Sequence, residues 1–283
     1  MTFFFEMRRA WSRHWPYYAA EAAGIGFFML CGTLLTILFE HPASPVYQAL
    51  ADQDLLRRAG IGLGMGLVIV VLVYNPWGKK SGAHINPAVT IAFWQLGKIR
   101  RADALWYMLA QLAGGLLMGQ LLKLTLGATF AHPAVDYLVT EPKKHGQLVA
   151  FGAEFVISFI LMVVMLLALH HERLKKSTGW LIGALLLLYI TFESPLSSMS
   201  LNPARTLGSA VAAQSYTGLW LYWVAPIAAM LLATVFFNKV YKGQNLACAI
   251  LAGCEAAPTA PRHHPPRYRA TSVPAGGGEV VKW

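Results

Sequence analysis

The stretch SGAHINPAVT, from Ser81 to Thr90, decides the fold of this chain, because its core returns as SMSLNPART between Ser198 and Thr206. In each stretch the asparagine can cap free backbone N–H groups, and the proline after it fits the first position of a helix. About ten largely apolar residues follow each Asn-Pro pair, enough for a helix of about 15 Å, which is half the apolar thickness of a bilayer. A single Asn-Pro-Ala tripeptide also occurs in ordinary capped turns, but two copies at matching places are a more specific signal. We therefore predict two half-helices that enter a membrane from opposite faces and meet at its centre.

The composition is that of a membrane protein. Of the 283 residues, 56% are hydrophobic and only 13% are charged, whereas soluble domains carry roughly 25% charged residues. The net charge of +10 does not indicate nucleic-acid binding, because the basic residues stand between apolar runs rather than on one polar face. The sequence contains no legible nucleophile–base pair and no metal-ligand spacing. We therefore predict no enzymatic activity, no catalytic residue, no metal site and no cofactor.

Six apolar segments approach the roughly 20 residues that a helix needs to cross a bilayer. We expect spans over about 17–38, 59–74, 104–126, 148–170, 179–192 and 218–241, which together define a membrane domain over 17–242. Residues 1–16 are predicted to be a cytoplasmic N-terminal segment. Residues 256–278 are rich in Pro, Gly, Ala and basic residues and lack an apolar period. We therefore predict that 243–283 form a disordered basic cytoplasmic tail that is dispensable for function.

The distribution of Lys and Arg predicts the orientation of the spans. Basic residues gather before span one, between spans two and three, between spans four and five, and at the end of span six. By the positive-inside rule these segments face the cytoplasm. Arg57, Arg58, Lys143 and Lys144 are exceptions on the other side, partly balanced by acidic residues there. We predict an integral protein of the plasma (inner) membrane with both termini in the cytoplasm.

The chain also repeats itself in an inverted sense. Glu21 lies early in span one and Glu154 lies early in span four. After each come one further span, an Asn-Pro-Ala segment and a third span, giving a first repeat over about 17–127 and a second over about 148–242. Because three spans is an odd number, the second copy enters the membrane upside down. Inverted repeats of this kind place a permeation site near the midplane, on the axis that relates the halves.

Several further residues accompany the two motifs. They are Tyr107, Gln111, Gly114 and Gly115 in the third span and Tyr222, Trp223 and Pro226 in the sixth. With them the chain resembles the aquaporin (major intrinsic protein) family over about 15–242. The resemblance implies an all-α membrane protein with six transmembrane helices plus two re-entrant half-helices in an inverted repeat. It also implies a right-handed bundle, a pore in each subunit, and a homotetramer in the lipid bilayer.

The two motifs form the predicted centre of the pore. Two helix N-termini that meet at the midplane create a positive potential, which opposes cations. The side-chain amides of Asn86 and Asn202 can donate hydrogen bonds to a passing oxygen and so orient a water molecule against proton transfer. The predicted pore-motif residues are Asn86, Pro87, Ala88, Asn202, Pro203 and Ala204.

Four other residues are assigned roles around this centre. Arg205 lies one turn after Asn202, and an arginine at membrane depth is by default a functional residue. The resemblance places it in a selectivity constriction. Glu21 and Glu154 are expected to hold the re-entrant backbone, as family precedent implies, because irregular backbone at membrane depth needs partners. His84 is expected to orient its own loop.

The remaining constriction positions follow by counting from the motifs. Ile190 stands twelve residues before Asn202, where strict water channels usually have His, and Met199 stands three before it. For the position in span two, the motif match favours Met65, whereas a count from Asn86 reaches Gly66. The predicted filter is therefore Met65 or Gly66 with Ile190, Met199 and Arg205, an apolar constriction with one donor.

These positions are compatible with two kinds of channel, one for water and one for small neutral solutes. Thr206, where glycerol channels typically carry Asp, favours water. We predict a passive channel for water with some passage of small neutral solutes. The alternative is a dedicated facilitator of glycerol, urea, ammonia or peroxide. A secondary transporter can also use inverted repeats, but it usually needs an ionisable coupling residue near the midplane.

Overall fold

The computed structural model describes residues 2–142, 144–241, 246 and 248–253. Within these residues all regular secondary structure is helical, and six helical segments are long and apolar enough to cross a membrane. The long helices are α1 (Thr2–Glu40), α3 (Asp54–Tyr74), α6 (Arg101–Leu126), α8 (Gly146–His170), α9 (Thr178–Leu188) and α12 (Leu221–Val240). The shorter ones are α2 (Pro45–Ala49), α4 (Pro76–Ser81), α5 (Pro87–Gln95), α7 (Ala128–Ala131), α10 (Ser194–Ser197) and α11 (Pro203–Ala213). Two single 3₁₀ turns cover Asp136–Leu138 and Lys175–Ser177.

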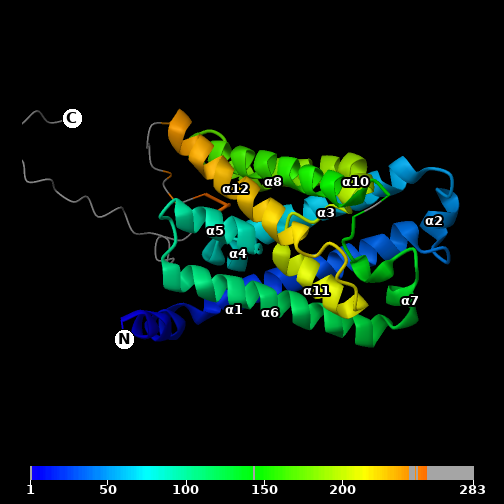
Figure 1. Cartoon of the computed structure of the whole chain (residues 1–283), viewed down its shortest axis with the longest axis horizontal. Coiled ribbons are helices and arrows are strands. Elements are labelled where there is room, and N and C mark those ends of the chain that lie inside the picture. Colours follow the sequence, from blue (N-terminus) through cyan, green and yellow to red (C-terminus); the bar gives the residue numbers. More distant parts are fainter. Residues whose placement is uncertain (1, 143, 242–245, 247, 254–283) are drawn as a thin grey trace, which may run out of the picture.

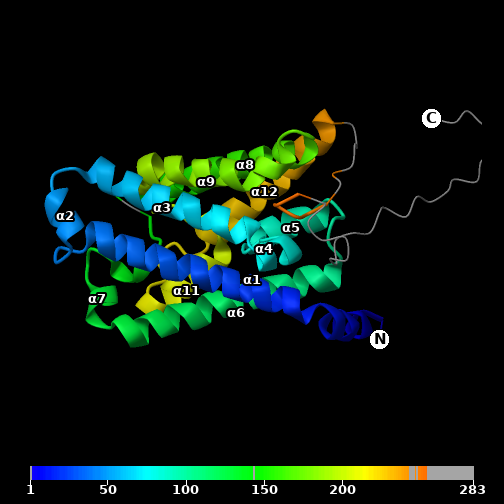
Figure 2. The same cartoon turned by 180° about the vertical axis from the view of Figure 1, so that it is seen from behind.

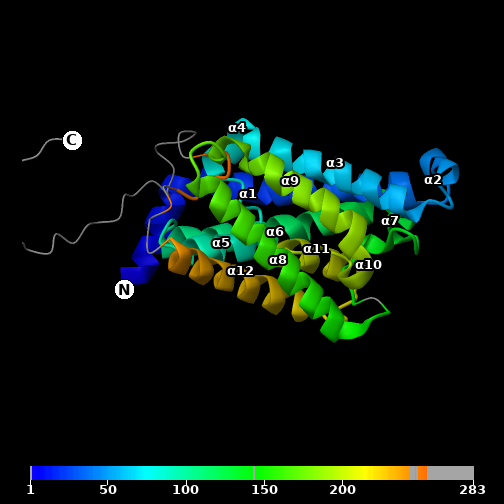
Figure 3. The same ribbon diagram turned by 90° about the horizontal axis from the view of Figure 1, so that it is seen from above.

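The long helices run side by side along the longest axis of the molecule (Figure 1). The short helices α5 and α11 lie within the bundle, seen from behind in Figure 2 and from above in Figure 3. Helix α1 begins and α12 ends at the same end of the bundle. We call this the inner end and the opposite end the outer end. The predicted all-α architecture with six spans and two short helices is confirmed.

Helix α1 starts earlier than the sequence indicated. It begins at Thr2, so nearly all of the segment expected over 1–16 belongs to the first helix. The start of α1 is anchored on α6, because Trp106 Nε1 donates to the carbonyl oxygen of Met7 at 3.0 Å. Pro16 lies inside α1, where the missing N–H removes one backbone hydrogen bond and permits a bend. Figures 1 and 3 show the dark-blue start of α1 turning away from the rest of the helix.

The fifth span is a composite rather than one regular helix. Helix α9 passes through a π-helical turn, Tyr189–Glu193, into α10. This turn contains Ile190, and π turns of this kind are frequent at functional sites. Arg58 Nε donates to the carbonyl oxygen of Thr191 at 3.0 Å, so a side chain of α3 supports the irregular backbone.

Glycines allow the helices to pack closely. A Cβ atom on Gly66 of α3 would lie 2.6 Å from the carbonyl oxygen of Gly183 on α9. A Cβ on Gly119 of α6 would lie 2.3 Å from the carbonyl oxygen of Gly208 on α11. Neither position can hold a larger residue without moving a helix, which is the usual role of small residues between membrane helices.

Part of the predicted tail is ordered. Leu246 and residues 248–253 lie in the segment predicted to be disordered, and their side chains are nearly all buried. The physical reason is that Leu246–Gly253 is a short, mostly apolar run that can pack against the bundle. The remaining tail residues, 254–283, lie outside the described part of the chain.

Candidate functional site

The two Asn-Pro-Ala segments meet inside the bundle. The Asn86 side chain accepts from Ala88 N at 2.9 Å and begins α5, and the Asn202 side chain accepts from Ala204 N at 3.0 Å and begins α11. Each asparagine also reaches across the junction. Asn86 Nδ2 donates to the carbonyl oxygen of Leu201, and Asn202 Nδ2 donates to that of Ile85, both at 2.8 Å.

This reciprocal pairing fixes both amides and leaves each of them a donor. A side-chain amide has two N–H groups. Among the described residues, the NH₂ group of Asn86 and that of Asn202 each have one acceptor, the carbonyl across the junction. The second N–H of each group can therefore serve a molecule in the adjoining cavity, which both asparagines line.

Glu21 holds the first segment from α1. Its carboxylate is fully buried and accepts from Ser81 Oγ at 2.7 Å and from the backbone N–H groups of His84 at 3.1 Å and Ile85 at 2.5 Å. Gln111 Nε2 of α6 donates to it as well, at 2.8 Å. The carboxylate thus satisfies donors that have no helical partner.

Glu154 repeats this arrangement on α8. It is fully buried and accepts from Ser197 Oγ at 2.9 Å and from the N–H groups of Ser200 at 2.6 Å and Leu201 at 2.8 Å. The three donors occupy the same positions relative to Asn202 as the three donors in the first half do relative to Asn86. The geometry matches the backbone-holding role expected for both acids.

The backbone before each asparagine is held in an unusual conformation. Ala83 and Ile85 have φ values of 55° and 42°, and Met199 and Leu201 have φ values of 48° and 61°. Non-glycine residues rarely adopt these left-handed angles, and they persist only where the surroundings enforce them. The two carboxylates supply that enforcement by binding the N–H groups of the same short segments.

His84 is held from several sides. Its Nδ1 lies 3.2 Å from Thr90 Oγ1, and its ring stacks on Phe93 with centroids 4.9 Å apart. Its Nε2 lies 2.9 Å from the carbonyl oxygen of Ala249. Because a carbonyl only accepts, Nε2 carries the proton in this contact. His84 therefore contacts its own loop, as expected, and also the chain beyond α12.

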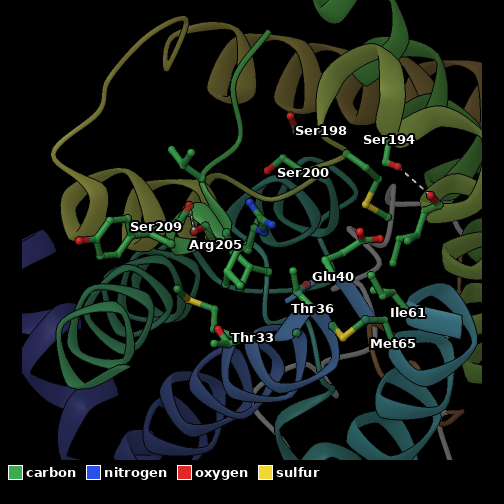
Figure 4. A pocket seen from close by; sticks show the side chains of 18 of the residues that line it. Thr33, Thr36, Glu40, Ile61, Met65, Ser194, Ser198, Ser200, Arg205 and Ser209 are labelled. Carbon is green, nitrogen blue, oxygen red and sulfur yellow. Dashed lines mark hydrogen bonds between the residues drawn. The ribbon is translucent and has the colours of Figure 1, made fainter. Parts of the chain in front are cut away.

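An outer cavity of about 290 Å³ gathers the expected filter residues. Met65, Ile190, Met199 and Arg205 all line it, and Figure 4 shows Met65 and Arg205 around this space. Gly66 does not line it, because it packs against Gly183. Of the two positions considered in span two, the structure therefore puts Met65 at the cavity.

Arg205 presents an unsatisfied donor to this cavity. Its side chain points into the space between the surrounding helices (Figure 4). Nη1 is buried and has no hydrogen-bond partner within the described residues. Because leaving a buried donor unpaired costs about 1–3 kcal/mol, a molecule that accepts a hydrogen bond is stabilised beside it.

Other residues line the outer cavity that the sequence did not single out. The polar ones include Thr33, Thr36, Glu40, Arg58, Ser194, Ser198 and Ser209, and the apolar ones include Phe28, Met29, Ile61, Phe130 and Val135. Ile61 could have been found, because it lies four residues before Met65 and so on the same helix face. The others depend on how the helices pack and carry no local signal.

A smaller inner cavity of about 60 Å³ contains the two asparagines. Met199 and Ser200 line both cavities, so the two spaces adjoin at this point. The rest of the inner wall is mainly apolar. It includes Ile69, Val73, Val89, Leu161, Met165, Ile182 and Leu251. Within the described residues, no cluster of three His, Cys, Asp or Glu side chains could hold a metal ion.

Comparison with known proteins gives consistent matches. The family described as major intrinsic protein matches residues 10–237. Aquaporin NIP1-1 of Arabidopsis thaliana is 33% identical over 207 residues, which are 72% of this chain and 69% of that protein. Nodulin-26 of Glycine max is 32% identical over 222 residues, 78% of this chain and 76% of that protein. The X-ray structure of the aquaglyceroporin from Plasmodium falciparum superposes with a TM-score of 0.66 at 22% identity, covering 80% of this chain and 96% of that one.

Proposed function

The chain belongs to the major intrinsic protein family, and we propose that it is a passive membrane channel for water that also admits small neutral solutes. The observation that carries the proposal is the junction of the two half-helices. There the Nδ2 atoms of Asn86 and Asn202 each donate to the carbonyl of the opposite half and line the inner cavity. Membership of a channel family supports passive permeation rather than catalysis.

The proposed route runs from the outer cavity to the inner one. A solute first meets Arg205 and the apolar side chains of Met65, Ile190 and Met199, which we propose as the filter. It then passes the two asparagines, which we propose as the pore motifs together with the Pro and Ala residues after them. The N-termini of α5 and α11 and the charge of Arg205 keep this route positive, which opposes cations and protons.

The filter is the basis for including solutes larger than water. Ile190 offers no hydrogen bond and so does little to penalise a carbon skeleton. The hydroxyl-bearing Ser194, Ser198 and Thr36 supply partners for polyols or urea in the outer cavity. This set favours the alternative function, a facilitator of glycerol, urea, ammonia or peroxide.

The setting of the channel is part of the proposal. We propose a homotetramer in the plasma (inner) membrane, with a channel domain over 17–242 and both termini on the cytoplasmic side. The start of α1 and the end of α12 at one end of the bundle support a common side for the termini. On this assignment the inner end faces the cytoplasm.

The test is stopped-flow light scattering on proteoliposomes that contain the full chain, in parallel for an impermeant osmolyte, glycerol and urea. A channel gives shrinkage faster than protein-free liposomes with a low activation energy and no saturation. A carrier shows saturation and coupling to an ion gradient. The proposal would be contradicted if water and solutes cross no faster than in protein-free liposomes, both for the full chain and for chains shortened after residue 242.

A further inference from the structure

The chain beyond α12 returns to the inner end of the bundle. Leu246, Cys248, Ala249, Ile250 and Leu251 are each at most 4% exposed. Figures 1 and 2 show this orange-red stretch lying at the end of the bundle where α5 and α12 end. A solvated tail would leave such apolar side chains exposed, so the stretch occupies a binding place on the bundle.

The stretch binds beside the inner cavity, on the segment that leads to Asn86. Leu251 N donates to the carbonyl oxygen of Gly82 at 3.2 Å, and His84 Nε2 donates to that of Ala249 at 2.9 Å. Gly82 and His84 belong to the segment that leads to Asn86. The returning chain therefore uses polar groups of the re-entrant segment itself rather than those of the outer helix surfaces.

The side chain of Leu251 lines the inner cavity. It shares this small space with Asn86, Asn202, Val73 and Val89. A leucine cannot hydrogen-bond to water, and hydrophobic constrictions close a pore by dewetting it. Because Leu251 lies between the asparagines and the inner end, it interrupts the row of hydrogen-bonded water molecules that a water channel needs.

We propose that Leu246 and residues 248–253 form an autoinhibitory plug that docks in the inner mouth of the pore and closes it. The inference rests on the proposed channel function. Among the described contacts, the plug is held by one backbone–backbone hydrogen bond, by one hydrogen bond from the His84 side chain and by apolar contacts. It can therefore leave the mouth while the bundle remains folded. The carbonyl of Gly82 then becomes free to accept a hydrogen bond from a permeating water.

The plug is tested by comparing three chains at equal protein density in liposomes: the full chain, a chain ending at residue 242, and a chain ending at residue 255. The chain ending at 255 is the matched control, because it keeps 246–253 and loses only the remainder of the tail. We expect the full chain and the 255 chain to pass water at similar low rates. The 242 chain should be about tenfold faster, which corresponds to a plugged state favoured by about 1.4 kcal/mol.

A full-length variant tests the plug without shortening the chain, so a folding defect in the shortened chain cannot account for the result. Leu251→Ala removes the side chain from the inner cavity but keeps the backbone N–H that binds Gly82, so water flux should rise severalfold. A synthetic peptide with the sequence of 246–253 should slow the 242 chain again, whereas a scrambled peptide should not. Equal flux for the full chain, the 242 chain and Leu251→Ala would overturn the plug while leaving the channel standing. Loss of flux in a correctly inserted 242 chain would also overturn it, because the segment would then complete the pore. If none of the chains raises water flux above that of protein-free liposomes, the channel function itself would be contradicted.

Discussion

The two halves of the molecule hold their re-entrant segments by the same contacts. In each half a buried glutamate binds a serine five residues before the asparagine and the two N–H groups directly before it. A tyrosine completes each set, since Tyr107 Oη donates to the Ser81 carbonyl at 2.7 Å and Tyr222 Oη to the Ser197 carbonyl at 2.6 Å. Irregular backbone at membrane depth must satisfy its polar groups within the protein. The same solution therefore appears twice.

The halves differ in the side chains that this common support carries. Three residues after the asparagine the first half has Val89 and the second has Arg205. Gln111 adds a fourth donor to the glutamate of the first half, whereas the matching position of the second half is Pro226. The contacts that hold the re-entrant segments therefore follow from backbone chemistry, whereas selectivity follows from the residues that differ between the halves.

The largest expected effect comes from removing either carboxylate. Glu21→Ala takes the acceptor away from two backbone N–H groups and from the Ser81 hydroxyl. Glu154→Ala takes it away from two backbone N–H groups, while the Ser197 hydroxyl keeps Glu193 as an acceptor. At about 1–3 kcal/mol for each buried group, the loss of stability should be about 3 kcal/mol or more, and flux should disappear. Glu21→Ala should be the worse, because the Ser81 hydroxyl loses its carboxylate and Gln111 Nε2 loses one of its two acceptors. Thermal unfolding of the detergent-solubilised protein measures this.

Ser158→Ala is the matched control for that experiment. Ser158 lies one turn after Glu154 on the same helix, and its buried hydroxyl has no hydrogen-bond partner within the described residues. Its loss should change little. If one carboxylate proves indispensable and the other is replaced without effect, the equivalence of the two halves fails.

The next effect concerns Ile190, which lies in the π-helical turn of the second half. Ile190→His adds bulk and a hydrogen-bonding edge opposite Arg205. A solute that leaves such a polar group unpaired is disfavoured by about 1–3 kcal/mol. Glycerol or urea flux should therefore fall roughly tenfold or more, on the scale that 1.4 kcal/mol gives a factor of ten, and water flux should change less.

Ile190→Val is the control, since it keeps the filter apolar and should preserve the ratio of glycerol to water permeability. If the wild type passes no solute larger than water, the proposal that the filter admits larger solutes is wrong, and Met65 or Met199 closes the pore. If the solute flux of Ile190→His equals that of the wild type, Ile190 does not form the constriction.

A smaller effect is expected when the second half is made to resemble the first. Arg205→Val reproduces the residue found at Val89 and removes the fixed charge from the outer cavity. The dipoles of α5 and α11 remain and still oppose cations, so proton leak should increase severalfold while water flux stays largely intact. Decay of an imposed pH gradient in liposomes measures the leak, and Arg205→Lys, which keeps the charge, should resemble the wild type.

The smallest effect should be equal in the two halves. Tyr107→Phe and Tyr222→Phe each remove one hydrogen bond to a serine carbonyl, at a cost of about 1 kcal/mol. Unfolding midpoints should therefore drop by similar small amounts without a change in selectivity. A loss in only one variant would show that the tyrosines support their segments unequally.

The sequence was informative where local chemistry and repetition coincide. Asn86 and Asn202 could be assigned as helix caps because Asn-Pro has a strong local preference, and the inverted repeat indicated that the caps meet. The two glutamates followed from the same repeat. The choice between Met65 and Gly66 could not be made by counting, because it depends on which face of α3 packs against Gly183.

The ends of the chain were the hardest to predict. The first span was expected to start at about residue 17, but helix α1 starts at Thr2, and the contact between Trp106 and Met7 supports its first turns. The run of small and apolar residues at 246–253 is too short to span a membrane and has no helical period. The burial of its described residues depends on contacts with a distant part of the chain, the segment that contains Gly82 and His84.

Water flux and pH-gradient decay, measured in parallel on the same liposomes, test whether the junction of Asn86 and Asn202 passes water and excludes protons. For the full chain and for the chain ending at residue 242, we expect water flux above that of protein-free liposomes. The pH gradient in both should decay no faster than in protein-free liposomes. A pH gradient that collapses as fast as water moves, or water flux no higher than in protein-free liposomes for both chains, would contradict this expectation.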